Sequence, residues 1–143
     1  MASSSWNPYL AMHRETMARV PAEYHRVWSS ELSEEERERL LNLVDMDKAL
    51  SYAWAIPDER ALQVLAHYSP IVEMGGGTGY WARCLRERGV DVLCYDLHPS
   101  EGAWTEVLKG GPAKLRDHAD RTLFLCYPDD FEHSDESMAL QCL

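Results

Sequence analysis

The sequence predicts an α/β fold, with a parallel sheet of about four strands flanked by helices and preceded by a helical N-terminal extension. Short, largely apolar segments recur in the second half of the chain, first at residues 71–74 and again at residues 92–95. Strands of this kind are buried on both faces, as in a parallel sheet with helices on each side. A helical pattern lies between them, and strand–helix–strand is the unit of open α/β folds. We therefore expect a helical extension over residues 1–70 and a sheet domain over residues 71–143.

Helix signals occur throughout the extension. A weak helical pattern covers residues 10–19, and Pro21 ends it because a proline ring breaks a helix interior. Ser33 and Glu36 have the spacing of a capping box, in which each side chain bonds the backbone of the other, so a helix is expected to start there. A further helix is predicted to begin near Pro57, because proline is favoured in a first helical turn.

Four strands are predicted for the sheet, at residues 71–74, 92–95, 105–108 and 123–127. A helix over residues 80–88 joins the first two and ends at Gly89. Only residues 97–104 join the second strand to the third, which is too short for a helical crossover. We therefore expect an extended loop at that connection, and the start of a further helix at residues 137–143.

The composition and charge exclude several classes of function. The 143 residues suit one domain, and 45% of them are hydrophobic, which is enough for a packed core. The net charge is −10 with no basic stripe, so tight binding to nucleic acid or to an anionic membrane is not expected. No apolar run approaches the roughly 20 residues of a membrane helix, and the first residues lack a secretory signal. The four cysteines have no zinc-like spacing, which predicts reduced thiols in a cytoplasmic protein without a metal site.

A glycine-rich motif follows the first predicted strand and opens the next helix. Glu73 precedes glycines at alternate positions, Gly75, Gly77 and Gly79, which let the backbone turn sharply and let a ligand approach closely. Asp96 ends the second strand, and the tips of adjacent parallel strands lie on the same sheet edge. A carboxylate there can accept hydrogen bonds from two ribose hydroxyls. The sequence therefore predicts a nucleoside-containing cofactor across the two strand ends.

This pattern of an acid, alternate glycines and a second acid resembles the class I S-adenosylmethionine-dependent methyltransferases, over about residues 71–127. A narrower resemblance, at residues 52–57, 75–82 and 120–122, is to an uncharacterised eukaryotic group of methyltransferase-like proteins. The resemblance implies a Rossmann-like methyltransferase fold, S-adenosylmethionine as cofactor and methyl transfer to an unknown acceptor.

The residues of the motif take their roles from the same resemblance. It implies that Gly75, Gly77 and Gly79 cradle the methionine and ribose portions of the cofactor. Glu73 would help to organise the ammonium group, and Asp96 would hold the ribose.

An NAD-binding Rossmann protein is the first alternative. Residues 77–82 also satisfy the dinucleotide pattern G-x-G-x-x-G/A. However, the glycines start two residues earlier than that pattern requires, and Glu73 stands where a methyltransferase has an acid. The bulky side chains of Tyr80 and Trp81 would also crowd a pyrophosphate, which S-adenosylmethionine lacks. A glycine turn with no ligand is a further alternative.

Aromatic residues flank the glycine motif on both sides. Tyr80 and Trp81 follow it directly, whereas Tyr52 and Trp54 precede the first strand. Aromatic side chains at such positions more often pack a core than contact a ligand. We therefore expect these four to be packing residues.

The resemblance stops after the fourth strand, whereas the family's sheet has seven. In the family order the fourth strand lies beside the first, and a fifth lies on its far side. We therefore expect a chain that is truncated relative to the family and that self-associates through the apolar edge at residues 123–127, since unpaired edges recruit strands. Residues 126–129 depart from the family's Asn/Asp-Pro-Pro-aromatic acceptor motif, so no catalytic residue is predicted. A catalytically inactive fragment that acts as an interaction module is the remaining alternative.

Overall fold

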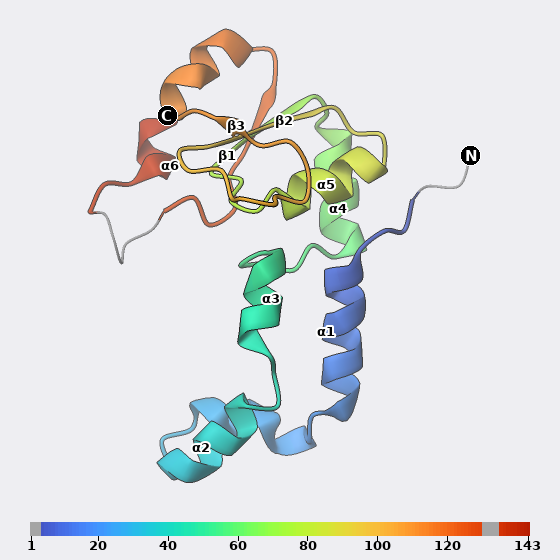
Figure 1. The fold of residues 1–143 in the computed structure, drawn as a ribbon, viewed down its shortest axis with the longest axis vertical. Coiled ribbons are helices and arrows are strands. Elements are labelled where there is room, and N and C mark those ends of the chain that lie inside the picture. The colour runs from blue at the N-terminus through green and yellow to red at the C-terminus, as the bar shows by residue number, and fades with distance from the viewer. Residues whose placement is uncertain (1–3, 130–134) are drawn as a thin grey trace.

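The computed structural model describes residues 4–129 and 135–143, which form a four-stranded sheet with helices packed against it (Figure 1). The strands are β1 (Ile71–Met74), β2 (Val92–Asp96), β3 (Leu108–Lys109) and β4 (Thr122–Phe124), in the spatial order β3-β2-β1-β4. Ile71 lies opposite both Val92 and Thr122. All three pairings are parallel. The predicted α/β class with a parallel sheet is therefore confirmed, and β4 lies beside β1 as expected.

Each face of the sheet has its own core. One face packs against α4 (Glu59–His67) and α5 (Tyr80–Glu87), and its buried residues include Ile71, Leu62 and Leu85. The other face contacts η2 (Pro112–His118) and α6 (Met138–Gln141), with Val72 and Met74 at its centre. Alternate residues of a strand point to opposite faces. Because both faces are covered, all four residues of β1 are buried.

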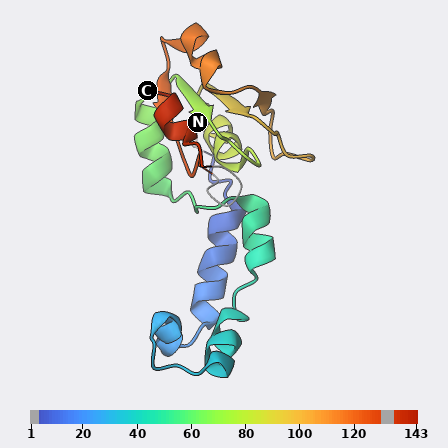
Figure 2. The same cartoon turned by 90° about the vertical axis from the view of Figure 1, so that its left-hand side faces the viewer.

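The helices at the start of the chain form an arm that extends from the sheet (Figures 1 and 2). In this arm α1 (Pro8–Arg19) leads away, η1 (Ala22–Trp28) and α2 (Glu34–Leu41) lie at the far end, and α3 (Met46–Tyr52) leads back. The expected capping box at the start of α2 is present. Glu36 N donates to Ser33 Oγ at 3.2 Å, and Ser33 N donates to Glu36 Oε2 at 3.3 Å. Although α4 also precedes residue 70, it packs on the sheet through Leu62.

Two strands differ from the sequence prediction. β3 begins at Leu108, because Thr105 and Val107 pack against Gly79 in the loop after β1 instead of extending the strand. β4 ends at Phe124, and Tyr127 then takes a left-handed backbone conformation (φ 49°) as the chain leaves the sheet. The extended connection between the second and third strands is confirmed, since residues 97–107 contain no helix. The sequence patterns do not predict η1, α3 or η2, which span only seven residues each.

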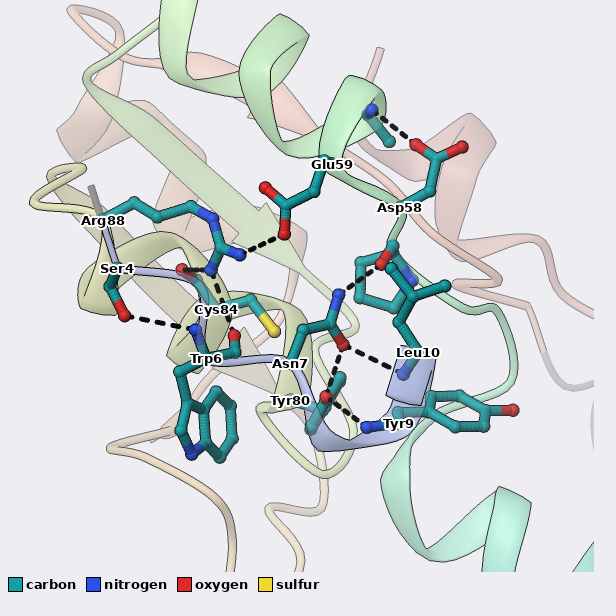
Figure 3. A network of polar contacts seen from close by, with 12 residues as sticks. Ser4, Trp6, Asn7, Tyr9, Leu10, Asp58, Glu59, Tyr80, Cys84 and Arg88 are labelled. Carbon is teal, nitrogen blue, oxygen red and sulfur yellow. Dashed lines mark hydrogen bonds and ion pairs between the residues drawn. The ribbon is translucent and has the colours of Figure 1, made fainter. Parts of the chain in front are cut away.

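A buried polar network joins the start of the arm to α5 (Figure 3). The Tyr80 hydroxyl donates to Asn7 Oδ1 at 2.7 Å and accepts a hydrogen bond from Tyr9 N at 2.9 Å. Arg88, at the end of α5, forms an ion pair of 2.6 Å with Glu59 of α4. Because Asn7 and Tyr80 are buried, their polar atoms depend on these partners. The network therefore fixes the base of the arm against the helix that begins at the glycine-rich loop.

Candidate functional site

A glycine-rich loop, residues 75–79, joins the carboxyl end of β1 to α5. Its backbone is left-handed at Gly77 (φ +56°) and at Gly79 (φ +75°), a conformation that residues with a Cβ atom rarely adopt. Gly79 is the N-cap residue of α5. The loop thus turns the chain from the sheet edge directly into the helix, and strand, loop and helix follow in the predicted order.

Asp96, the last residue of β2, lies against this loop. Its Oδ2 accepts a hydrogen bond from Gly77 N at 2.8 Å, and its Oδ1 accepts one from His98 N, also at 2.8 Å. The structure therefore brings the predicted carboxylate and the middle glycine of the motif into direct contact. Since a carboxylate has about four acceptor positions, Asp96 retains capacity for the hydroxyl groups of a ligand.

The three glycines of the motif face different surroundings. No atom lies within 4 Å of the position that a Cβ on Gly77 would take. A Cβ on Gly75 would lie 3.2 Å from Pro128 Cα and 3.4 Å from Met138 Sδ, and one on Gly79 would lie 2.8 Å from Val107 Cγ2. Gly77 therefore offers the open approach to the loop. Gly75 and Gly79 allow the chain itself to pack closely against the loop.

Most backbone N–H groups of the loop already have partners. Gly75 N and Gly76 N both donate to Tyr95 O at 2.9 Å, and Gly79 N donates to Gly76 O at 2.9 Å. Gly77 N is bonded to Asp96, as described above. A pyrophosphate is bound in Rossmann folds largely by backbone N–H groups of such a loop and of the helix that follows it. These four donors are not free for that role.

Glu73 lies beneath the loop in the core of the sheet. Only 2% of its surface is exposed, and the Cys94 thiol donates to Glu73 Oε2 at 3.8 Å. Burial raises the pKa of Glu73 to about 8, although the Cys94 hydrogen bond and the charge of Arg86 lower it in part. A Cβ on Gly76 would collide with Cys94 Sγ and lie 3.6 Å from Glu73 Oε1. The carboxyl group is thus largely protonated at neutral pH and lies directly under the loop backbone.

The end of α3 is fastened to the loop from the other side. The Thr78 hydroxyl donates to Tyr52 O, Trp81 Nε1 donates to Ala55 O at 3.0 Å, and Trp104 Nε1 donates to Ser51 O at 3.1 Å. The first two bonds hold Tyr52 and Ala55 against the loop and the first turn of α5, and the third ties α3 to the connection between β2 and β3. The sequence offers no signal for them, because each joins residues more than 20 positions apart.

The aromatic side chains around the loop divide into a buried and an exposed set. Tyr52 stacks on Trp104 with ring centroids 5.1 Å apart, and it meets Tyr80 edge-on at 5.3 Å. Tyr52 and Tyr80 are thus packing residues, as expected. Trp54 is 72% exposed, contrary to the expectation that it packs in the core.

Tyr127 is a further candidate site residue, in the segment 126–129 that departs in sequence from the acceptor motif of the methyltransferases. It is 68% exposed and has a left-handed backbone (φ 49°). The next residue, Pro128, lies against Gly75. A residue before proline is normally extended, so nothing in the sequence signals this conformation. Backbone strain of this kind often occurs at functional sites.

Two hollows lie away from the glycine-rich loop. The larger, of about 420 Å³, is lined by residues of α4 together with Trp81 and Phe124. The smaller, of about 190 Å³, lies in the arm and is lined by residues that include Arg26, Glu36 and Leu40. Neither hollow includes a residue predicted to bind the cofactor.

Residues 4–129 and 135–143 contain neither a metal-binding cluster nor a helix that could span a membrane. Within those ranges no three His, Cys, Asp or Glu side chains are grouped so that they could hold a metal ion. In the same part of the chain, no helix combines the length and the apolar character needed to cross a membrane.

Comparisons with known proteins do not identify the chain. No protein-family model, no curated protein and no solved structure matches it. The resemblance to methyltransferases therefore rests on the sequence motif alone. What the structure shows is an α/β protein with a four-stranded parallel sheet.

Proposed function

We propose that the chain binds S-adenosylmethionine across the carboxyl ends of β1 and β2. One observation carries the proposal: Asp96 converges on the glycine-rich loop at Gly77, where the approach to the backbone is open. In this assignment Asp96 holds the ribose hydroxyls, and the loop from Gly75 to Gly79 supports the ribose and methionine portions. Glu73, buried beneath the loop and largely protonated, acts on the ammonium end only by supporting the loop backbone.

The hydrogen bonds of the loop favour S-adenosylmethionine over NAD. A dinucleotide presents a pyrophosphate, which requires free N–H donors at the loop. Four of these donors are occupied within the protein, at residues 75, 76, 77 and 79. S-Adenosylmethionine has no pyrophosphate, so its binding does not depend on these N–H donors.

The proposed activity is methyl transfer to an acceptor that the site does not identify. When bound, S-adenosylmethionine supplies a methyl group on a sulfonium that is already reactive. The protein contributes by positioning the methyl donor relative to the acceptor. Asp96 fixes the loop through Gly77 N, and the Thr78 hydroxyl fastens it to Tyr52 O. Tyr127, exposed three residues after the end of β4, is a candidate contact for the acceptor.

The edge of β4 supports a second role, that of an interaction module. Among the described residues, β4 pairs with β1 alone, so its other side can accept a further strand.

We also propose that the protein is cytoplasmic, which the four free cysteines support.

Isothermal titration calorimetry with S-adenosylmethionine, S-adenosylhomocysteine and NAD tests the cofactor assignment. The expected result is one site for each adenosyl ligand and no heat of binding for NAD. Preferential binding of NAD would establish the alternative cofactor. Absence of binding by all three ligands would reduce the glycine-rich loop to a structural turn.

A further inference from the structure

Among the described residues, none pairs with the backbone on the outer side of β4. Thr122 N donates to Pro70 O at 2.9 Å, toward β1. Successive residues of a strand direct their N–H and C=O groups to opposite sides. The N–H and C=O groups of Leu123 therefore point away from β1, where no described strand pairs with them. Proteins usually cover or charge such an edge, because it can pair with another strand.

The larger hollow lies beside this edge. It is lined by Ala61, Val64 and Leu65 of α4, Trp81 of α5 and Phe124 of β4, with Asp58 and Arg60 also on its wall. The rings of Trp81 and Phe124 are 5.4 Å apart. Val64 is 51% exposed. The free edge is therefore flanked, on the α4 face of the sheet, by a mostly apolar hollow of about 420 Å³.

A second copy of the chain is complementary to this surface. A two-fold axis through Leu123, perpendicular to the sheet, would pair β4 with its counterpart in antiparallel fashion. Each Leu123 would then donate to and accept from the other, and each Phe124 would face Thr122 of the second copy. Both Phe124 side chains would lie on the same face of the joined sheet as the two hollows. The same strand thus supplies both the edge and the apolar side chain.

The charge distribution permits this association despite the net charge of −10. Residues 20–47 contain eight acidic and three basic residues, a net charge of −5. This half of the charge lies in the part of the arm farthest from the sheet (Figure 1). The hollow itself carries one acid and one base, Asp58 and Arg60. In a dimer, Asp58 of one copy can therefore lie near Arg60 of the other, while the acidic ends of the two arms remain far from the interface.

We propose that two copies of the chain form a two-fold dimer by antiparallel pairing of β4, with the apolar hollow between α4 and Phe124 closed at the interface. The dimer joins the two sheets into one. Residues 75–79 do not line the hollow, so the dimer does not depend on cofactor binding.

Sedimentation velocity over a micromolar concentration series tests the dimer. The wild type is expected to change from monomer to dimer as the concentration rises. Val64→Asp should raise the dissociation constant of the dimer roughly tenfold or more, because each dimer then buries two carboxylates in the hollows. Met46→Asp is the matched control, because Met46 is 54% exposed and lies in the arm. It should leave the dimer unchanged.

Hydrogen exchange of the wild type gives a second readout that does not depend on a variant. The Leu123 amide should become protected as the concentration rises through the transition. A monomer at every concentration would overturn the proposal. So would a dimer that leaves the Leu123 amide unprotected, or one that Met46→Asp weakens as much as Val64→Asp does.

Discussion

Replacing Glu73 with glutamine should stabilise the protein at pH 8 relative to the wild type, with a much smaller effect at pH 4.5. In the folded protein the carboxyl is buried under the glycine-rich loop and its pKa is raised to about 8, whereas an exposed glutamate has a pKa of 4.5. Between these values the unfolded chain releases the Glu73 proton and the folded protein keeps it. The unfolded state is therefore favoured progressively as the pH rises from 4.5 to 8, and the wild type loses stability over that window.

The size of the effect follows from the same two values. At about 1.36 kcal/mol for each pKa unit, a rise from 4.5 to about 8 corresponds to about 5 kcal/mol. That is comparable to the whole stability of many small domains. Glutamine has no proton to release, and its amide keeps an acceptor oxygen for the Cys94 thiol.

Urea denaturation of both proteins at a series of pH values measures the difference. The free energy of unfolding of Glu73→Gln minus that of the wild type should grow by about 4 kcal/mol between pH 4.5 and pH 8, because the carboxyl is half-ionised in the unfolded chain at the first pH and in the folded protein at the second. Glu101→Gln replaces an exposed carboxyl and serves as the matched control, with a nearly constant difference. A constant difference for Glu73→Gln as well would refute the buried, protonated carboxyl.

Two further substitutions test the loop and the base of the arm. Gly77→Ala should abolish binding of S-adenosylmethionine, because its Cβ enters the open approach, and should cost about 1–2 kcal/mol of stability in a left-handed conformation. Gly89→Ala is the matched control, because Gly89 has φ +76° and open space around it. This variant should lose as much stability as Gly77→Ala but bind the cofactor as the wild type does. Equal affinity of the two variants in calorimetry would contradict the role of Gly77. Tyr80→Phe removes the acceptor of Tyr9 N and should lower the free energy of unfolding by about 1–3 kcal/mol. In the same denaturation assay the exposed control Tyr68→Phe should match the wild type, and equal stability of Tyr80→Phe would show that this hydroxyl is not required.

The central strands could be predicted from the sequence because both of their faces are buried. Residues 71–74 and 92–95 are largely apolar segments, interrupted only by Glu73, and the structure has β1 and β2 within a residue of those bounds. The predicted third strand begins three residues before β3, because Thr105 and Val107 have the composition of a strand but pack against Gly79. Whether an apolar residue pairs with a neighbouring strand or packs on a loop is decided by contacts distant in sequence, which the local pattern does not contain.

The candidate site could be predicted in part for a similar reason. Parallel strands bring their carboxyl ends to one edge, so the proximity of Asp96 to the glycine-rich loop follows from the order of the elements. The hydrogen bond from Gly77 N to Asp96 and the link from Thr78 to Tyr52 depend on how the loop and the arm are packed. The left-handed conformation of Tyr127 runs against the usual preference before proline.

The ribose preference of the wild type and of Asp96→Asn tests the cofactor assignment most directly. Calorimetry would compare S-adenosylhomocysteine with its 2′-deoxyribose analogue on both proteins. If Asp96 accepts a hydrogen bond from the missing hydroxyl, the wild type should prefer the ribose form by roughly tenfold to a hundredfold, since hydrogen bonds to charged groups contribute about 1.5–3 kcal/mol. Asp96→Asn should lose most of that preference. An equal preference in both proteins, or no binding of S-adenosylhomocysteine by the wild type, would contradict the assignment.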